Sequence, residues 1–138
     1  MVTISIEVDM AEVLAKLEGM SARSNDFKPV FRDAKKTLQA ANASNFDTGG
    51  MLVGGWSPRR DEYAWPILRK TGELEGSLTS LDGPANKIEA TSAQFGTDVE
   101  YAKFHQTGTT KMASRKIVFE PRGFARGVAE NAADHILG

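Results

Sequence analysis

The feature that most constrains the fold is a long amphipathic stretch in the first third of the chain. Apolar residues recur there at spacings of three and four, and charged residues occupy the opposite side. This pattern is typical of a helix with one apolar face. We predict a helix that is capped by Asn25 or Asp26, tolerates Pro29 in its first turn and runs to about Asn45. The apolar stripe, which other elements must cover, consists of Phe27, Val30, Phe31, Ala34, Leu38 and Ala41.

The ends of the chain supply elements that could cover this stripe. Alternating residues from Val2 to Val8 predict a half-buried strand. Asp9 and Glu12 have the spacing of a capping box, which predicts a short helix ending near Met20. The tail predicts a further helix because apolar residues recur at every fourth position, at Phe124, Val128, Ala132 and Ile136.

Between about residues 46 and 66 no period fits, and the segment contains four glycines and two prolines. Connections of this length are usually functional or mobile. Trp56, Tyr63 and Trp65 are costly to leave in water, so a glycine-rich loop that carries them suggests a surface buried against another molecule. The alternative, that the tryptophans fold back onto their own core, stays open at this stage.

The segment from Ile67 to Leu81 predicts a short helix capped near Thr71, followed by a strand that begins around Leu78. Four later segments, KIEATS, AQFGTD, EYAKFHQTG and RKIVFEP, predict antiparallel strands, the last of them closed by Pro121. We therefore predict a single α+β domain over residues 1–138. Its mostly antiparallel sheet of about four to five strands packs against a long N-terminal helix and a C-terminal helix, with a long glycine-rich loop.

Length and composition are those of one ordinary folded domain of 138 residues. The absence of cysteine excludes disulfides and thiolate metal sites. The first residues lack the pattern of a signal peptide, and no apolar run approaches the ~20 residues needed to cross a bilayer. These observations favour a protein that is made and used in a cytosol, away from membranes.

The charge is unevenly distributed although its net value is only −1. Residues 1–20 carry four acids against Lys16, whereas residues 103–126 carry six basic residues against Glu120. Such asymmetry concerns partners rather than fold. The basic segment could contact nucleic acid, or it could meet an acidic face on another subunit, and the small net charge favours the second reading.

No arrangement of residues in the sequence points to catalysis or to a cofactor. His105 and His135 are the only histidines, and neither has metal-ligand spacing. There is no nucleophile elbow, and Asp98 and Glu100 read as a solvated strand edge. We therefore predict neither enzyme activity, metal nor cofactor, and we interpret His105 as a histidine hydrogen-bonded at the end of a strand.

Nucleic-acid binding has somewhat more support. Phe104, Phe119 and Phe124 interleave with the basic residues, as stacking platforms sometimes do. The same phenylalanines also fit the periods of a strand and a helix, and no zinc-finger or helix-turn-helix signature occurs. A small soluble nucleic-acid-binding or regulatory protein is the alternative hypothesis.

Three groups of residues, in order, resemble motifs of a known family. They are GGWSP, then ILRKTGELEGSLTS, then FGTDVEYAKFHQTGTTKMASRKIVF, and together they cover roughly Phe46 to Phe119. The family is that of phage virion morphogenesis proteins, the tail-completion proteins of Mu-like phages, which are similar to neck and tail-terminator proteins of long-tailed phages. Ser114, Lys116 and the C-terminal segment depart from the family pattern. The matching positions are Gly55 to Pro58; Leu68, Thr71, Gly72, Leu74 and Ser77; Gly96, Val99, Tyr101, Ala102, His105, Gln106 and Gly108; and Ala113 with Arg115.

The resemblance implies a structural virion protein without catalytic activity. It implies a ring at the head–tail junction, hexameric by analogy with tail terminators, that contacts neck, connector and tail-tube proteins and is assembled in the bacterial cytoplasm. Genomic DNA would pass through the lumen without sequence-specific binding. The candidate interface residues are Trp56, Pro58, Arg59, Arg60, Trp65, Thr71, Gly72, Leu74, Tyr101, His105, Gln106, Gly108, Lys111, Arg115 and Lys116.

A closed ring needs two unlike faces on each subunit, and the acidic N-terminal region and the basic region 103–126 would supply them. Two further expectations follow. We expect residues 46–66 to be disordered or divergent in the free subunit and ordered in the particle. Reversing the charge at Arg115 impairs the joining of heads to tails and leaves the subunit folded.

Overall fold

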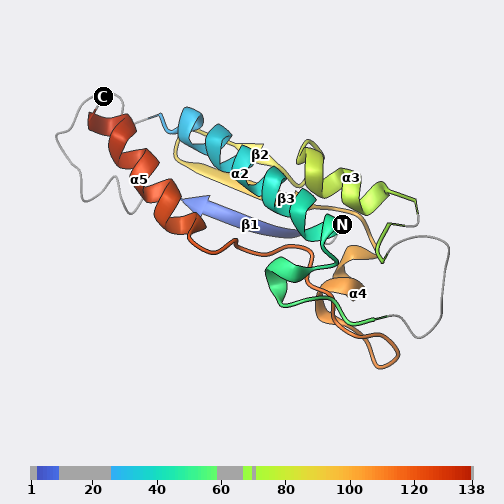
Figure 1. The fold of residues 1–138 in the computed structure, drawn as a ribbon. Coiled ribbons are helices and arrows are strands. Elements are labelled where there is room, and N and C mark those ends of the chain that lie inside the picture. Colours follow the sequence, from blue (N-terminus) through green and yellow to red (C-terminus); the bar gives the residue numbers. More distant parts are fainter. Residues whose placement is uncertain (1–2, 10–25, 59–66, 70, 138) are drawn as a thin grey trace.

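A computed structural model describes residues 3–9, 26–58, 67–69 and 71–137 (Figure 1). Within these ranges the chain is an α+β protein, as predicted. Helices lie over one face of a small antiparallel sheet, and α4 lies at one end of the molecule (Figure 1). The elements are β1 (Ile4–Asp9), α2 (Lys28–Asp47), the 3-10 helix η2 (Met51–Val53), α3 (Glu73–Ser80), β2 (Lys87–Ile88), β3 (Ser92–Thr97), α4 (Ala102–Thr107) and α5 (Phe124–Leu137).

The sheet has the order β1-β3-β2, and both pairings are antiparallel. Ile6 lies opposite Phe95 and Val8 lies opposite Ala93. Residues directly opposite each other share a face of the sheet, so these side chains form one apolar face. Phe95 and Ala93 are buried and belong to the core that α2 and α3 complete. The sheet is therefore apolar on the side that faces the helices.

The short strand β2 is extended by a side chain. Just before β2, the side-chain amide of Asn86 pairs with both backbone groups of Gly96. Its Oδ1 accepts from the Gly96 N–H at 2.9 Å, and its Nδ2 donates to the Gly96 carbonyl at 3.2 Å. A Cβ at position 96 would lie 2.0 Å from the carbonyl oxygen of Ile4. Only glycine fits this close approach between β3 and β1.

Helix α2 follows the predicted stripe. Five of its six residues are buried, and Ala41 is half-buried. Pro29 occupies the first turn, as expected, but the N-cap is Phe27 rather than Asn25 or Asp26. The Asp26 carboxylate accepts a hydrogen bond from the Lys28 N–H at 3.1 Å just before the helix. The helix ends at Asp47, two residues beyond the predicted end.

Helix α5 packs beside the N-terminal half of α2. Its four predicted core residues, Phe124, Val128, Ala132 and Ile136, are all buried. The Asn131 amide donates to the Asp33 carboxylate at 3.1 Å, and the His135 ring lies 5.7 Å from that of Phe27. The C-terminal helix is therefore confirmed as a cover for the stripe.

Helix α3 packs against the C-terminal half of α2. The buried Asn42 donates to the Leu78 carbonyl at 2.8 Å, and Gln39 donates to the Ser80 carbonyl at 2.8 Å. Leu78 lies inside α3, so the prediction that a strand begins there was wrong. Helix α3 ends at Ser80, and its C-cap Leu81 adopts a left-handed conformation with φ 52°.

Two other predicted strands were also wrong. The segment EYAKFHQTG contains α4, and RKIVFEP forms no regular strand. The described sheet therefore has three strands rather than four or five. In α4 Ala102 is buried, whereas Phe104 is exposed. In so short a run, the spacing of apolar residues does not distinguish a helix from a strand.

The predicted glycine-rich loop is not confirmed as such. Its first part is the end of α2, a turn and η2, with Gly49, Gly50, Gly54 and Gly55 all at positive φ. Residues 59–66 lie outside the described residues, as does the helix predicted near residues 10–20. In the part of the chain that is described, no helix has the length and apolar character to cross a membrane.

Candidate functional site

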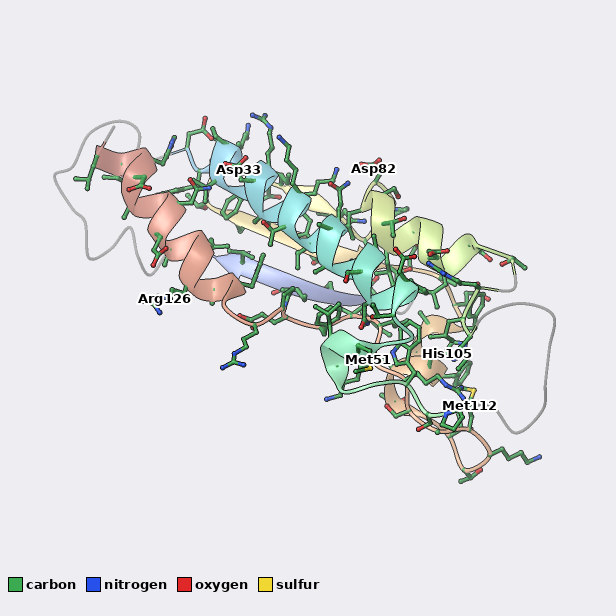
Figure 2. All side chains as sticks on the ribbon, viewed as in Figure 1. Asp33, Met51, Asp82, His105, Met112 and Arg126 are labelled. Carbon is green, nitrogen blue, oxygen red and sulfur yellow. The ribbon has the colours of Figure 1, made fainter. Side chains whose placement is uncertain are left out.

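The first and third groups of motif residues meet at the end of the molecule that carries α4, whereas the second group begins α3. We call α4 with Tyr101, residues 50–58 around η2, and residues 108–118 the α4 end. Figure 2 shows Met51, His105 and Met112, which come from these three segments, at this same end. Residues more than fifty positions apart in sequence are therefore neighbours in the fold, joined by the contacts described below.

Trp56 anchors the turn after η2. Its side chain is only 8% exposed, its ring meets Phe46 edge-on at 5.3 Å, and its Nε1 donates to the Lys116 carbonyl at 2.8 Å. A Cβ at Gly50 would lie 2.4 Å from the indole, so glycine is required beneath the ring. Trp56 therefore folds back onto the protein's own core and does not wait for another molecule to bury it.

Arg115 joins the same turn from the other side. Its Nε donates to the Ser57 carbonyl at 2.9 Å and its Nη2 to the Pro58 carbonyl at 3.3 Å. Its own N–H donates to the His105 carbonyl at 2.6 Å, and the residue is only 9% exposed. A glutamate here would place a carboxylate against carbonyl oxygens. The geometry therefore argues against the expectation that a charge reversal at Arg115 leaves the subunit folded.

Gln106 takes the place of a neighbouring strand. Its Oε1 accepts from the N–H groups of Ile117 and Val118 at 2.9 and 3.0 Å, and its Nε2 donates to the Val118 carbonyl at 2.6 Å. One amide side chain thus satisfies three backbone groups of a segment that pairs with none of the described strands. This explains how RKIVFEP is held without belonging to the sheet.

His105 lies on α4 rather than at the end of a strand, which corrects our interpretation. Its ring meets that of Tyr101 edge-on at 5.9 Å. Its Nδ1 is buried, and none of the described residues forms a hydrogen bond with it. Burial, and after it the positive charge of Arg115, lowers the pKa of His105. The imidazole therefore favours the neutral form.

A tight hairpin projects beyond α4. Gly108 has φ 74°, and a Cβ there would lie 2.8 Å from the backbone nitrogen of Ser114. Thr109 and Met112 form an isolated antiparallel bridge, with the Thr109 N–H donating to the Met112 carbonyl at 2.8 Å. Lys111 is exposed between them. Glycine at position 108 is what allows the chain to return so closely on itself.

The second motif group begins α3. Gly72 is the N-cap at φ 74°, Leu74 is buried, and the Thr71 hydroxyl accepts from the Glu73 N–H at 3.3 Å. Thr71 therefore lies at the helix start, as predicted. Here the motif serves the start and the packing of α3.

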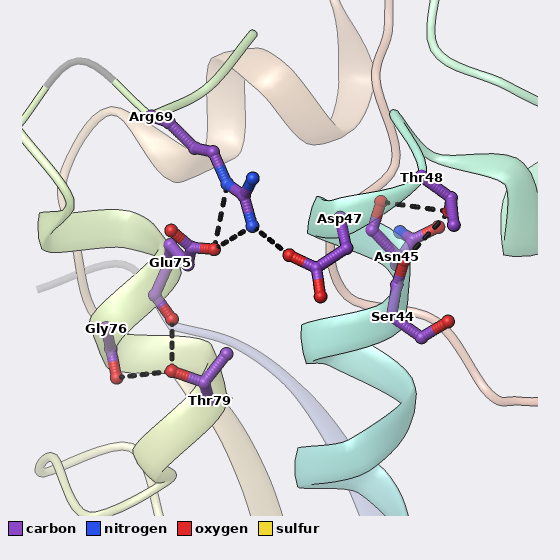
Figure 3. A network of polar contacts seen from close by, with 8 residues as sticks. All are labelled: Ser44, Asn45, Asp47, Thr48, Arg69, Glu75, Gly76 and Thr79. Atoms are coloured by element: carbon purple, nitrogen blue, oxygen red, sulfur yellow. Dashed lines mark hydrogen bonds and ion pairs between the residues drawn. The ribbon is translucent and has the colours of Figure 1, made fainter. Parts of the chain in front are cut away.

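Sequence reasoning missed the ion-pair network beside this helix start. Arg69 contacts Asp47 at 2.6 Å and also bonds Glu75, so it ties the end of α2 to α3 (Figure 3). The hydrogen bonds to Asp47 and then to Glu75 raise the pKa of Arg69. No periodicity signals this link, because its members lie in three separate segments.

The candidate interface residues fall into four groups by exposure. Pro58, Thr71, Gly72, Tyr101, Lys111 and Lys116 are exposed; His105, Gln106 and Gly108 are half-buried; Trp56, Leu74 and Arg115 are buried; and Arg59, Arg60 and Trp65 lie outside the described residues.

Comparison with known proteins places the chain in a family. A family model for the phage virion morphogenesis family matches residues 8–130. The chain belongs to the phage virion morphogenesis family. It is also similar to "Mu-like prophage FluMu G protein 2" of Haemophilus influenzae, with 27% identity over 132 residues, which cover 95% of this chain and 89% of that protein. No solved structure matches the chain.

Membership in the phage virion morphogenesis family gives the chain a structural or assembly role in a phage virion. The contacts at the α4 end fit a structural role. The side chains of Trp56, Gln106 and Arg115 bond to backbone groups of neighbouring segments. Among the described residues, no three histidine, cysteine or acidic side chains lie close enough together to hold a metal ion.

Proposed function

We propose that this phage virion protein is a subunit of a homo-oligomeric ring at the head–tail junction. In this role it completes or terminates the tail and joins the tail tube to the connector. Residues far apart in sequence lock together at the α4 end through side-chain-to-backbone hydrogen bonds, and this observation carries the proposal. Such an end is a rigid surface for docking rather than a reaction site.

The surface of the α4 end suits contact with other proteins. Lys111 and Lys116 are exposed, and so are the aromatic side chains of Tyr101 and Phe104. Aromatic side chains supply contact area, and lysines at a rim select an acidic partner. Neighbouring neck or tail-tube rings are the partners that the proposed position provides, and genomic DNA passes through the lumen without sequence-specific recognition.

A nucleic-acid-binding role has less support. Of the three phenylalanines that interleave with basic residues, Phe124 is buried in the core and Phe119 is half-buried. Phe104 is exposed, with the Lys103 ammonium 5.0 Å from its ring centre. One exposed ring is a weak stacking platform compared with the series that single-stranded binding uses.

Two measurements test the proposed function. Image reconstruction of the assembled particle is expected to place the subunit in a ring between head and tail. Native mass measurement is expected to give a hexamer of about 90 kDa, six times the subunit mass of 15.0 kDa. Absence of the protein from the particle would refute the proposal. A steep loss of DNA affinity with added salt would instead favour nucleic-acid binding.

A further inference from the structure

Two large apolar side chains project from η2 into solvent. Met51 is 66% exposed and Leu52 is 45% exposed. We call them the Met51–Leu52 knob. Figure 2 shows Met51 at the surface of the α4 end. Apolar side chains placed next to each other in water are typical of a surface that a partner covers.

The backbone holds the knob in this exposed position. Gly50 and Gly54, on either side of η2, have φ of 85° and 93°, which glycine adopts without strain. The buried Asn45 accepts a hydrogen bond from the Leu52 N–H at 3.1 Å through its Oδ1. Behind the turn, Trp56 fills the space over Gly50. The knob is thus part of a fixed turn and is ready to dock without further ordering.

A groove with apolar walls, which could receive apolar side chains, lies between α2 and α5. Its volume is about 150 Å³, and its apolar walls are formed by Val30, Ala34, Phe124 and Val128. Gly127 lines it as well, and a Cβ at that position would meet no atom within 4 Å. We call this the α2–α5 groove. The missing side chain leaves open space above an apolar floor, which suits insertion of an unbranched side chain such as methionine.

Knob and groove lie on different parts of the subunit. The groove contacts α2 between Val30 and Thr37, whereas η2 follows the end of α2 at Asp47. At roughly 1.5 Å per residue, Asp33 and Asp47 are about 20 Å apart along the helix. A subunit cannot fill its own groove with its own fixed knob. A contact between the two must join separate copies through unlike surfaces, and such contacts generate a ring where the rotation between copies closes.

The charges around the two surfaces are complementary. Lys116 is exposed, and its backbone carbonyl accepts from the Trp56 indole behind the knob. The exposed carboxylate of Asp33 lines the groove, and Glu130 and Asp134 are exposed on α5 three and seven residues after Gly127, on the same side of that helix. Glu130 has a partner on its own helix, since Arg126 lies 3.3 Å away. Asp33, which accepts a hydrogen bond from Asn131, and Asp134 favour the approach of a lysine-bearing surface.

We propose that the Met51–Leu52 knob of one subunit inserts into the α2–α5 groove of a second copy of this chain. The inference rests on the proposed ring and names the contact that repeats around it. Met51 enters the space beside Gly127, and Lys116 meets the acidic side chains of that surface. Repetition of this contact from copy to copy joins all subunits by one type of interface.

The chain contains no cysteine, so introduced cysteines report the contact directly. We expect Met51→Cys protein mixed with Gly127→Cys protein to form a disulfide between the two variants under mild oxidation. A double variant is expected to give a ladder of linked subunits. Gly76→Cys is the matched control, because Gly76 is also an exposed helix glycine with no atom within 4 Å of its Cβ position. It is expected not to link to Met51→Cys.

A second pair of variants tests the groove without a disulfide cross-link. Gly127→Leu fills the groove and is expected to weaken self-association roughly tenfold or more, whereas Gly76→Leu leaves it unchanged. Thermal unfolding shows whether each variant folds. If native mass measurement finds a ring but Met51→Cys and Gly127→Cys do not link preferentially, the knob contact is wrong and the ring stands. If subunits show neither self-association nor linkage and are absent from the particle ring, both proposals fail.

Discussion

In the body of the molecule, the sheet and helices α2, α3 and α5 bury large apolar side chains against one another. Phe27, Phe31 and Phe95 are all fully or almost fully buried there. At the α4 end the contacts are of another kind, because Trp56, Gln106 and Arg115 bond to backbone groups of other segments. The two regions therefore differ in balance. The body relies mainly on apolar burial, although Gln39 and Asn42 also bond to backbone carbonyls there, and the α4 end relies more on such bonds.

This difference has consequences for how each region responds to change. Apolar burial is non-directional and is shared by the whole core, so its loss is felt throughout the body. A hydrogen bond from a side chain to the backbone contributes about 1 kcal/mol net, but leaving its buried partner unsatisfied costs more. We expect that removing one of these bonds opens the α4 end locally while the body stays folded.

The largest effect is expected in the body. Phe31→Ala removes a fully buried ring of α2 from the core and should lower the free energy of unfolding by about 3–5 kcal/mol. Phe104→Ala is the matched control, since that ring is 45% exposed, and should cost less than about 1 kcal/mol. Denaturant unfolding measures both. Similar losses for the two variants would contradict the division between body and α4 end.

The sequence predicted the body better than the α4 end for a physical reason. The apolar stripe of α2 and the fourfold spacing of α5 are properties of single segments, so periodicity reveals them. The partial alternation of apolar and polar residues from Tyr101 to Thr107 resembles a strand. The segment nevertheless forms a helix, in which Ala102 is the buried residue. Over so few residues, tertiary contacts decide between the two.

The contacts of the candidate site were beyond any local pattern. Gln106 bonds to residues 117–118, Arg115 to residues 57–58, and Arg69 to Asp47, and each link spans separate segments. Only the resemblance to the phage virion morphogenesis family pointed to Gln106 and Arg115, as motif positions in order along the chain, and nothing in the sequence pointed to Arg69 and Asp47. The interface role of the motif residues stays a prediction, while the structure gives their contacts. The virion role rests on the family match.

A smaller and local effect is expected at Gln106. Gln106→Ala leaves three backbone groups of Ile117 and Val118 without their partner and should cost about 1–3 kcal/mol. Hydrogen exchange should speed up at the amides of residues 117–118 with little change in α2. Gln39→Ala, which removes a single bond to the Ser80 carbonyl, is the control and should leave those amides protected. Uniformly faster exchange would mean that the α4 end and the body open together.

The smallest effect concerns His105, through which the α4 end should respond to pH. Because the pKa of His105 is lowered in the folded protein, mainly by burial, the folded state disfavours protonation. Its contribution to stability is present above the ordinary histidine pKa of about 6.5 and is lost as the pH falls through the lower folded value. His105→Phe keeps an aromatic ring beside Tyr101 but cannot titrate. We expect the melting temperature of the wild type to fall more steeply than that of the variant as the pH is lowered from 7 through this range, and parallel curves would show that His105 contributes nothing to the pH dependence.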